Sequence, residues 1–291
     1  MKNLKKDLND YAKGLKNSEM IDESHFYDFR QNIFGNYMSE EFQKMFLEGD
    51  GNELASKACA VHSSSMLGYN FFHYVSRKPL TIDFGDNQKI SYTKVRFEVK
   101  MRVFKGRSRP ANMDIVLFND KGDILFIESK FLEYLSTGDF SISDTYKKPE
   151  TYYCMGEKWA SFISSLKTDI KGQYWGGIKQ EISHMIGLTN WAYGYTKIDK
   201  LPSYNADKDI RFINLVFKPS KEYTVEYEAY LNYKNRYDEL HKGLLDNGLI
   251  PDGIKMCFKN YSEFWPSFEK CVSLELRDYL FKHYMQYAEL Q

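Results

Sequence analysis

The sequence predicts an α/β fold in which helices flank a mixed central β-sheet, with further helices added at both ends of the chain. Apolar and alternating runs typical of strands cluster in residues 79–130 and recur at 211–217. Segments with helical spacing precede and follow these runs, in the order expected of an α/β domain. The 291 residues, 43% of them apolar, are enough to bury one large core.

The N-terminal part is expected to be helical. In residues 1–48, Phe26, Phe29 and Ile33 recur at helical spacing, so we expect this segment to cap the core. A long helix is expected over residues 53–74, where small and apolar side chains recur on one face.

Four strands are expected next, over residues 79–84, 89–104, 112–118 and 123–130. In the second strand, apolar side chains from Val95 to Val103 alternate with charged ones, which is typical of a half-solvated strand. The fourth strand is apolar on both faces until its charged end, which is typical of a buried central strand.

The second half of the chain is expected to be mainly helical. The predicted helices span residues 144–166, with an interruption at Pro149, and residues 177–191, 221–245 and 261–289. A buried strand is expected at 211–217 and a short extended piece near 254–258. The chain is therefore divided into an N-terminal helical cap at 1–48, a core at 49–220 and a C-terminal helical extension at 221–291 that packs on the core.

Charge and composition argue against several classes of protein. The formal net charge is zero, which disfavours a protein that coats nucleic acid by bulk electrostatics. The four cysteines are scattered, so neither a zinc site nor a disulfide framework is predicted, in keeping with a reducing cytoplasm. No apolar run approaches a membrane span, and residues 1–16 lack the apolar core of a signal peptide. We therefore expect a cytoplasmic protein without a membrane partner.

Two carboxylates and an ammonium are predicted to meet on a strand hairpin. Asp114 lies in the third expected strand, and Glu128 and Lys130 end the fourth, after a polar turn that contains glycine. If Phe118 pairs with Ile124, Asp114 falls opposite Glu128, with β-carbons about 5 Å apart. Alternation along each strand then places Asp114, Glu128 and Lys130 on one face of the sheet.

This arrangement predicts a magnesium site with a base beside it. Like charges on neighbouring strands repel, so a protein that keeps them opposite each other needs a compensating cation. Mg²⁺ prefers carboxylate oxygens, keeps several waters and completes its shell with phosphate oxygens. Lys130, two residues from Glu128, is placed to reach the same water or phosphate.

These residues resemble the core motif of the PD-(D/E)XK nucleases, the restriction-endonuclease-like superfamily. That motif is an Asp, a hairpin turn, and then Glu or Asp, any residue and Lys, and here Asp114 is followed by Glu-Ser-Lys at residues 128–130. The Pro-Asp pair of the family is not intact, because Pro110 lies four residues before Asp114. The resemblance spans roughly residues 50–217 and implies a restriction-endonuclease-like core.

The resemblance implies a metal-dependent DNA nuclease that leaves a 5′ phosphate. Asp114 and Glu128 would hold Mg²⁺, with Mn²⁺ as a substitute, and Lys130 would orient the attacking water. Two further residues match family positions: Glu53, expected on a helix beside the sheet and as an additional metal ligand, and Gln180 on the helix after the hairpin. The implied role is restriction or defence against foreign DNA, with repair equally compatible, and the family's many dimeric double-strand cutters make a homodimer compatible too.

Basic residues near the motif are candidates for DNA contact. Lys105, Arg107 and Arg109 directly precede the strand of Asp114, and Lys179 adjoins Gln180. Lysine and arginine at such positions are suited to meeting backbone phosphates. The alternative is an ordinary solvated loop, since charge runs usually face water.

A second Glu-x-Lys pattern, at residues 98–100, is expected to lie outside the site. Asp83 upstream of it would pair near Ile90, which leaves Glu98 about 26 Å further along the strand, too far for the two to share one metal. Glu98 is therefore expected on the polar outer face, although a contribution to the site from this neighbouring strand stays open.

Other functions stay open as alternatives. The histidines show no metal-ligand spacing and are expected to be packing or surface residues, and no phosphate-binding loop or dinucleotide fingerprint is present. A nucleophile pair of Cys154 and His184 is a remote alternative. The main alternative is a catalytically inactive nucleic-acid-binding or regulatory protein on the same fold. A further one is an interaction domain whose hairpin charges form a surface network, and its melting temperature would not respond to Mg²⁺.

Overall fold

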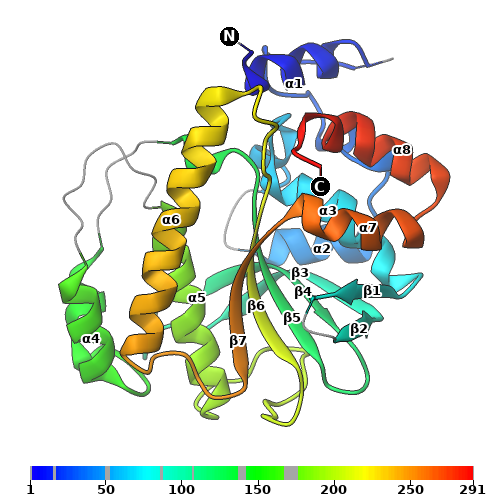
Figure 1. Cartoon of the computed structure of the whole chain (residues 1–291). Coiled ribbons are helices and arrows are strands. Elements are labelled where there is room, and N and C mark those ends of the chain that lie inside the picture. Colours follow the sequence, from blue (N-terminus) through cyan, green and yellow to red (C-terminus); the bar gives the residue numbers. More distant parts are fainter. Residues whose placement is uncertain are drawn as a thin grey trace.

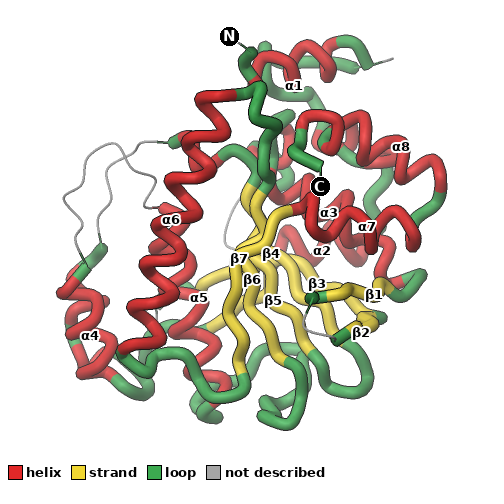
Figure 2. Tube along the Cα trace, in the orientation of Figure 1, coloured by secondary structure: helices red, strands yellow, loops and turns green. Residues whose placement is uncertain are grey.

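The computed structural model describes residues 2–15, 18–49, 53–85, 88–106, 108–136, 142–166 and 176–290. A five-stranded mixed β-sheet forms its centre, and helices lie on both sides of the sheet (Figures 1 and 2). The predicted fold class, a mixed central sheet flanked by helices, is therefore confirmed.

The central sheet has the strand order β3-β4-β5-β6-β7. Its strands are β3 (Lys94–Met101), β4 (Ala111–Phe118), β5 (Ile124–Lys130), β6 (Ile210–Val216) and β7 (Ile254–Asn260). The first three are antiparallel neighbours, whereas β5, β6 and β7 run parallel. A separate antiparallel pair consists of β1 (Leu80–Asp83) and β2 (Lys89–Tyr92). Every residue of β5 and β6 is buried, as their apolar runs predicted.

The helices are α1 (Leu4–Lys13), α2 (Glu40–Glu48), α3 (Ser64–Phe72), α4 (Gly156–Ser165), α5 (Gly176–Ala192), α6 (Thr224–Asp246), α7 (Tyr261–Cys271) and α8 (Leu274–His283). Helix α5 packs against β3, β4 and α6 on one side of the sheet, and α3 packs against β4 and β5 on the other (Figure 1). None of the described helices is long and apolar enough to cross a membrane.

Several expected elements differ from the structure. The expected strand at 89–104 is divided into β2 and β3, the expected helix at 144–166 is an α-helix only from Gly156, and the one at 261–289 is divided into α7 and α8. Between α1 and α2 the described residues form short 3-10 turns at Phe29–Asn32 and Phe34–Asn36 and an isolated β-bridge between Met20 and Phe26, in place of a helix. The long helix expected over residues 53–74 is wrong, because α3 begins only at Ser64. Ser63 caps this helix by accepting the N–H of Met66, and serine favours such a helix start over a helix interior.

The C-terminal segment contributes both to the sheet and to the anchoring of α1. Strand β7 is a full edge strand, although it lies in the part expected to be a helical extension, and the division of the chain at residue 221 stays a prediction. The N–H of Leu4 in α1 donates to Glu226 of α6 at 2.9 Å, and Tyr11 contacts His283 of α8 at 3.3 Å. Helix α1 is thus held by helices from the other end of the sequence.

Candidate active site

Asp114 lies where β4 separates from β5. The pairing of Phe118 with Ile124 is as predicted, and the ladder continues to Ile115 and Ile127, one step before Asp114. The carboxylate of Asp114 instead accepts the backbone N–H of Ser129 at 2.7 Å. Burial, together with the negative charge of Glu128, raises the pKa of Asp114 well above its ordinary value.

Lys130 contacts both Glu128 on its own strand and Gln180 on α5. Its ammonium donates to the carboxylate of Glu128 and, at 2.8 Å, to the amide oxygen of Gln180 at the start of α5. Glu128 is fully buried and Lys130 is nearly so. The structure therefore brings Asp114, Glu128, Lys130 and Gln180 together, with the Glu128 carboxylate enclosed rather than open to solvent.

His184, expected to be a packing or surface residue, is buried with both ring nitrogens facing groups of the site. Nε2 lies 3.0 Å from the carbonyl oxygen of Asn112 on β4, and Nδ1 lies 3.3 Å from the carboxylate of Glu128 on β5. Burial lowers the pKa of His184, although the charge of Glu128 acts in the opposite direction. The Cys154 thiol is directed at Asn190, so the nucleophile pair with His184 is not formed.

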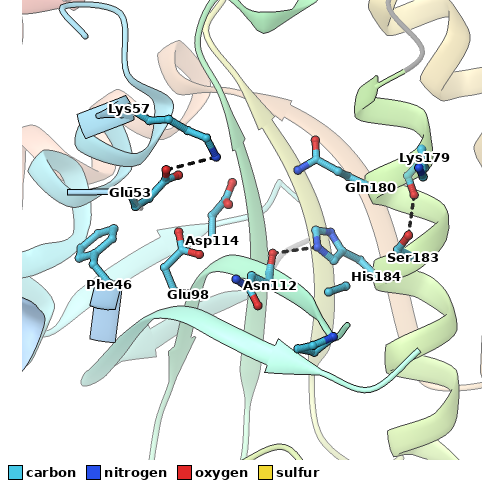
Figure 3. A pocket seen from close by; sticks show the side chains of 12 residues that line it. Phe46, Glu53, Lys57, Glu98, Asn112, Asp114, Lys179, Gln180, Ser183 and His184 are labelled. Atoms are coloured by element: carbon cyan, nitrogen blue, oxygen red, sulfur yellow. Dashed lines mark hydrogen bonds and ion pairs between the residues drawn. The ribbon is translucent and has the colours of Figure 1, made fainter. Parts of the chain in front are cut away.

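Glu98 lies on the polar face of β3, as its alternation predicted, and this face borders the site cavity. The β3–β4 ladder pairs Phe97 with Ile115 and Val99 with Met113 but omits Glu98, whose φ of +52° is in the left-handed region. This backbone conformation is unfavourable for a residue with a β-carbon. The half-buried side chain lines the same cavity as Asp114 (Figure 3). Burial and the charges of Glu53 and Glu128 raise the pKa of Glu98 to about 8.

Glu53 reaches the site from a turn and not from the expected helix. Its carboxylate accepts a hydrogen bond from Ser65 of α3 at 2.9 Å and lies 3.2 Å from the ammonium of Lys57. The side chain is half-buried and lines the cavity that contains Asp114 and Glu98. Ser65 and Lys57 therefore orient a third carboxylate toward this cavity.

These side chains line a cavity of about 400 Å³, here called the site cavity. Glu53, Glu98 and Asp114 lie on one side of it, and α5 carries Gln180 and His184 on the other (Figure 3). Its lining consists of Phe46, Glu53, Lys57, Glu98, Pro110, Ala111, Asn112, Asp114, Lys179, Gln180, Ser183 and His184. Glu128 is not among these residues, because Lys130 and His184 enclose it.

The carboxylate oxygens that line the site cavity are the type of ligand that a hard divalent cation prefers. Three carboxylates face one space, and a bound cation would offset their like charges. The pKa of Glu98 is raised first by burial and then by the charges of Glu53 and Glu128. The three carboxylates are not gathered into a ready ligand set, since no group of three or more His, Cys, Asp or Glu side chains among the described residues is arranged to hold a metal ion.

A second polar network lies behind the site in α5. Glu181 is fully buried and accepts a hydrogen bond from Asn214 of β6 at 2.6 Å, and Asn214 also donates to Tyr233. Burial raises the pKa of Glu181 well above its ordinary value. Glu181 and His184 thus lie on the buried face of α5, whereas the exposed Gln180 reaches Lys130 from the start of the helix.

The residues predicted to contact DNA are spread around this site. Lys179 is half-buried and lines the site cavity. Lys105 and Arg109 are exposed, and Arg109 adjoins the cavity residue Pro110. Arg107 lies outside the described residues. The assignment of these four side chains to DNA stays a prediction.

A comparison with protein families gives one match. The family model described as "restriction endonuclease associating with ARP" matches residues 2–175, more than half of the chain. The match includes Glu53, Glu98, Asp114, Glu128 and Lys130 and ends before α5. No curated protein and no solved structure matches the chain.

Proposed function

Because the chain belongs to the family of restriction endonucleases associating with ARP, we propose that it is a metal-dependent deoxyribonuclease of the PD-(D/E)XK type. The family supports a nuclease role, and it implies DNA as the substrate. The observation that carries the finer proposal is the place of Asp114. Its carboxylate binds the N–H of Ser129 at the end of the β4–β5 ladder, beside the Glu128–Lys130 pair. A role in restriction or defence follows from the family, and the protein ARP named in its description is proposed as a partner.

Asp114, Glu53 and Glu98 are the residues proposed to hold Mg²⁺, with Mn²⁺ as a substitute. All three line the site cavity, whereas Glu128 is available to an ion only when Lys130 releases its carboxylate. When bound, the ion polarises the scissile phosphate and lowers the pKa of a bound water.

The remaining residues position groups around this centre. The ammonium of Lys130, oriented by Gln180, is placed to hold a water and to offset negative charge that develops on the phosphate. His184 lies between the two strands where the ladder no longer joins them, with Nε2 at the Asn112 carbonyl of β4 and Nδ1 at 3.3 Å from the Glu128 carboxylate of β5. His184 is therefore proposed as a positioning residue.

The test is cleavage of supercoiled and linear DNA by the purified protein with Mg²⁺, Mn²⁺ or EDTA. Asp114→Asn keeps an acceptor for the Ser129 N–H and removes the charge, so we expect a folded protein that does not cut. Asp120→Asn, the same change at an exposed residue of the same hairpin, serves as the control and should cut like the wild type. A fully active Asp114→Asn protein would refute the site assignment.

The enclosed state of Glu128 favours one second candidate, a DNA-binding or regulatory protein on the same fold that does not cut. It predicts DNA binding without cleavage in any metal, and a melting temperature that Mg²⁺ leaves unchanged. A nuclease with a true metal site is instead stabilised by Mg²⁺ through mass action. Homodimer formation and a cytoplasmic location stay predictions.

A further inference from the structure

Three cavities adjoin one another through shared lining residues. A second cavity of about 620 Å³ shares Glu53, Lys57, Asp114 and Gln180 with the site cavity, and we call it the α3 arm. A third cavity of about 330 Å³, here called the β3 arm, shares Glu98 and Pro110 with the site cavity. The three cavities therefore adjoin one another in a row, here called the groove, and the carboxylates of the candidate active site line the middle one.

The α3 arm presents hydrogen-bond donors and cations. Its walls include Lys5 of α1, Lys57, and the three consecutive serines 63–65 at the start of α3. Lys130 also lines this arm, beside the shared residues Asp114 and Gln180. Lys5 is exposed and forms no ion pair with any other residue that the structure describes. This arm therefore offers a cation that no protein carboxylate neutralises.

The β3 arm carries cations at the free edge of the central sheet. Arg96, Lys100 and Arg102 project from β3 and the residue after it, and Lys197 follows α5. Within the described part of the chain, Arg96, Arg102 and Lys197 form no ion pair. Three carboxylates also line this arm, Glu48, Glu98 and Asp199, and Glu48 lies 3.8 Å from Lys44 of the same helix. The basic side chains outnumber the acidic ones at this end.

We infer that the two arms hold the backbone phosphates of one DNA strand on either side of the bond that is cut. This inference rests on the proposed function and adds to it the surfaces that bind the DNA strand. A polyanion is repelled by the central carboxylates unless its flanking phosphates meet cations, and unpaired lysine and arginine side chains lie at both ends of the groove. Cations on only one side would be expected for an enzyme that holds a strand by its end.

The experiment measures binding of a fluorescently labelled DNA oligonucleotide in EDTA, which prevents metal-dependent cutting, as a function of salt concentration. One variant, Lys5→Gln, alters the α3 arm, and a double variant, Arg102→Gln with Lys197→Gln, alters the β3 arm. The control is Lys94→Gln with Lys208→Gln, the same type of charge change in a separate cavity. Melting temperatures of all variants show whether each remains folded.

We expect each lost phosphate contact to weaken binding by about fivefold at 0.15 M salt and to reduce the slope of log affinity against log salt by about 0.7 to 0.9. Both arms should show these losses, and the control should bind like the wild type. Equal losses in the control, or losses in one arm only, would overturn the inference. If the arm variants bind normally while the wild type cuts DNA, the inference fails and the proposed nuclease stands. If the wild type neither binds nor cuts any DNA, the proposed function itself fails.

Discussion

Replacing Glu98 by glutamine is expected to stabilise the metal-free protein at neutral and alkaline pH. Burial and the neighbouring carboxylates raise the pKa of Glu98 from an ordinary 4.5 to about 8 in the folded chain. In the unfolded chain this group ionises near pH 4.5, whereas in the folded chain it stays protonated until about pH 8. The stability that the protonated form provides is therefore complete below pH 4.5 and is lost as the pH rises toward 8.

The size of this effect follows from the interval between the two pKa values. Each pKa unit corresponds to about 1.4 kcal/mol, and pH 7.5 lies three units above 4.5, so the wild type loses on the order of 4 kcal/mol relative to its fully protonated state. Glu98→Gln cannot ionise and avoids this loss. For a chain of this length the gain amounts to a melting temperature on the order of 5 °C higher.

Thermal unfolding in EDTA at pH 5 and at pH 8 provides the assay. The advantage of Glu98→Gln over the wild type should be small at pH 5 and large at pH 8, and saturating Mg²⁺ should shrink it. Glu41→Gln, an exposed position of α2, is the control and should show no gain at either pH. An advantage that does not depend on pH, or a loss of stability at pH 8, would refute the electrostatic account of this site.

Three further predictions concern single residues. His184→Gln should raise the Mg²⁺ concentration for half-maximal cleavage and for half-maximal thermal stabilisation by about 10- to 100-fold, because the ring lines the site cavity and lies against the Asn112 carbonyl and the Glu128 carboxylate behind it. Unchanged values would leave it a purely structural residue. Gly68→Ala should lower the free energy of unfolding by about 1–3 kcal/mol in urea titrations, since the added β-carbon would meet Ile115 at 2.7 Å. Burial alone would raise the pKa of Asp209, but hydrogen bonds from Arg211 of β6 and Lys255 of β7 hold this pKa below its ordinary value. The stability that ionised Asp209 provides is therefore present above pH 3.8 and is lost as the pH falls further. Asp209→Asn should therefore show a weaker loss of melting temperature below pH 4 than the wild type, and an identical acid profile would contradict this.

The hairpin of the site was predictable from sequence because its determinants are local. The strand bounds of β4 and β5, the pairing of Phe118 with Ile124 and the apolar character of β5 follow from alternation and turn composition. The position of Asp114 beside the end of β5 then follows from arithmetic on residue numbers. Residue numbers alone did not show that β4 and β5 separate at Asp114. There the Asp114 carboxylate, and not a backbone carbonyl, accepts the N–H of Ser129.

Glu98 lies on the polar face that alternation predicted. The sequence did not show that this face borders the site cavity where β3 passes Asp114, because that depends on how β3 and β4 pair and on the elements packed over them. No local pattern encodes the φ of +52° that Glu98 adopts there. The helix expected to carry Glu53 failed for a different reason, since the three serines before Met66 favour a helix start at that point.

The face of α5 shows the same limit at longer range. Gln180 was identified through the family resemblance, whereas His184, one turn further along, was treated as an ordinary buried histidine. Its partners are the Asn112 carbonyl and Glu128, which are distant in sequence, so its role depends on tertiary contacts. The spacing of four residues from Gln180 was the available signal.

The anchoring of α1 by α6 and α8 has a consequence for the order of events during translation. Chains emerge from the ribosome N-terminus first, so α1 with Lys5 appears early, but Glu226, which accepts the N–H of Leu4, appears only after the whole candidate active site has been made. Strand β5 likewise lacks its parallel neighbour until β6 begins at Ile210. A nascent or truncated chain therefore carries the carboxylates without the completed groove around them. For a protein proposed to cut DNA, this order of assembly means that cleavage requires a chain in which β6 and α6 have already been synthesised and folded.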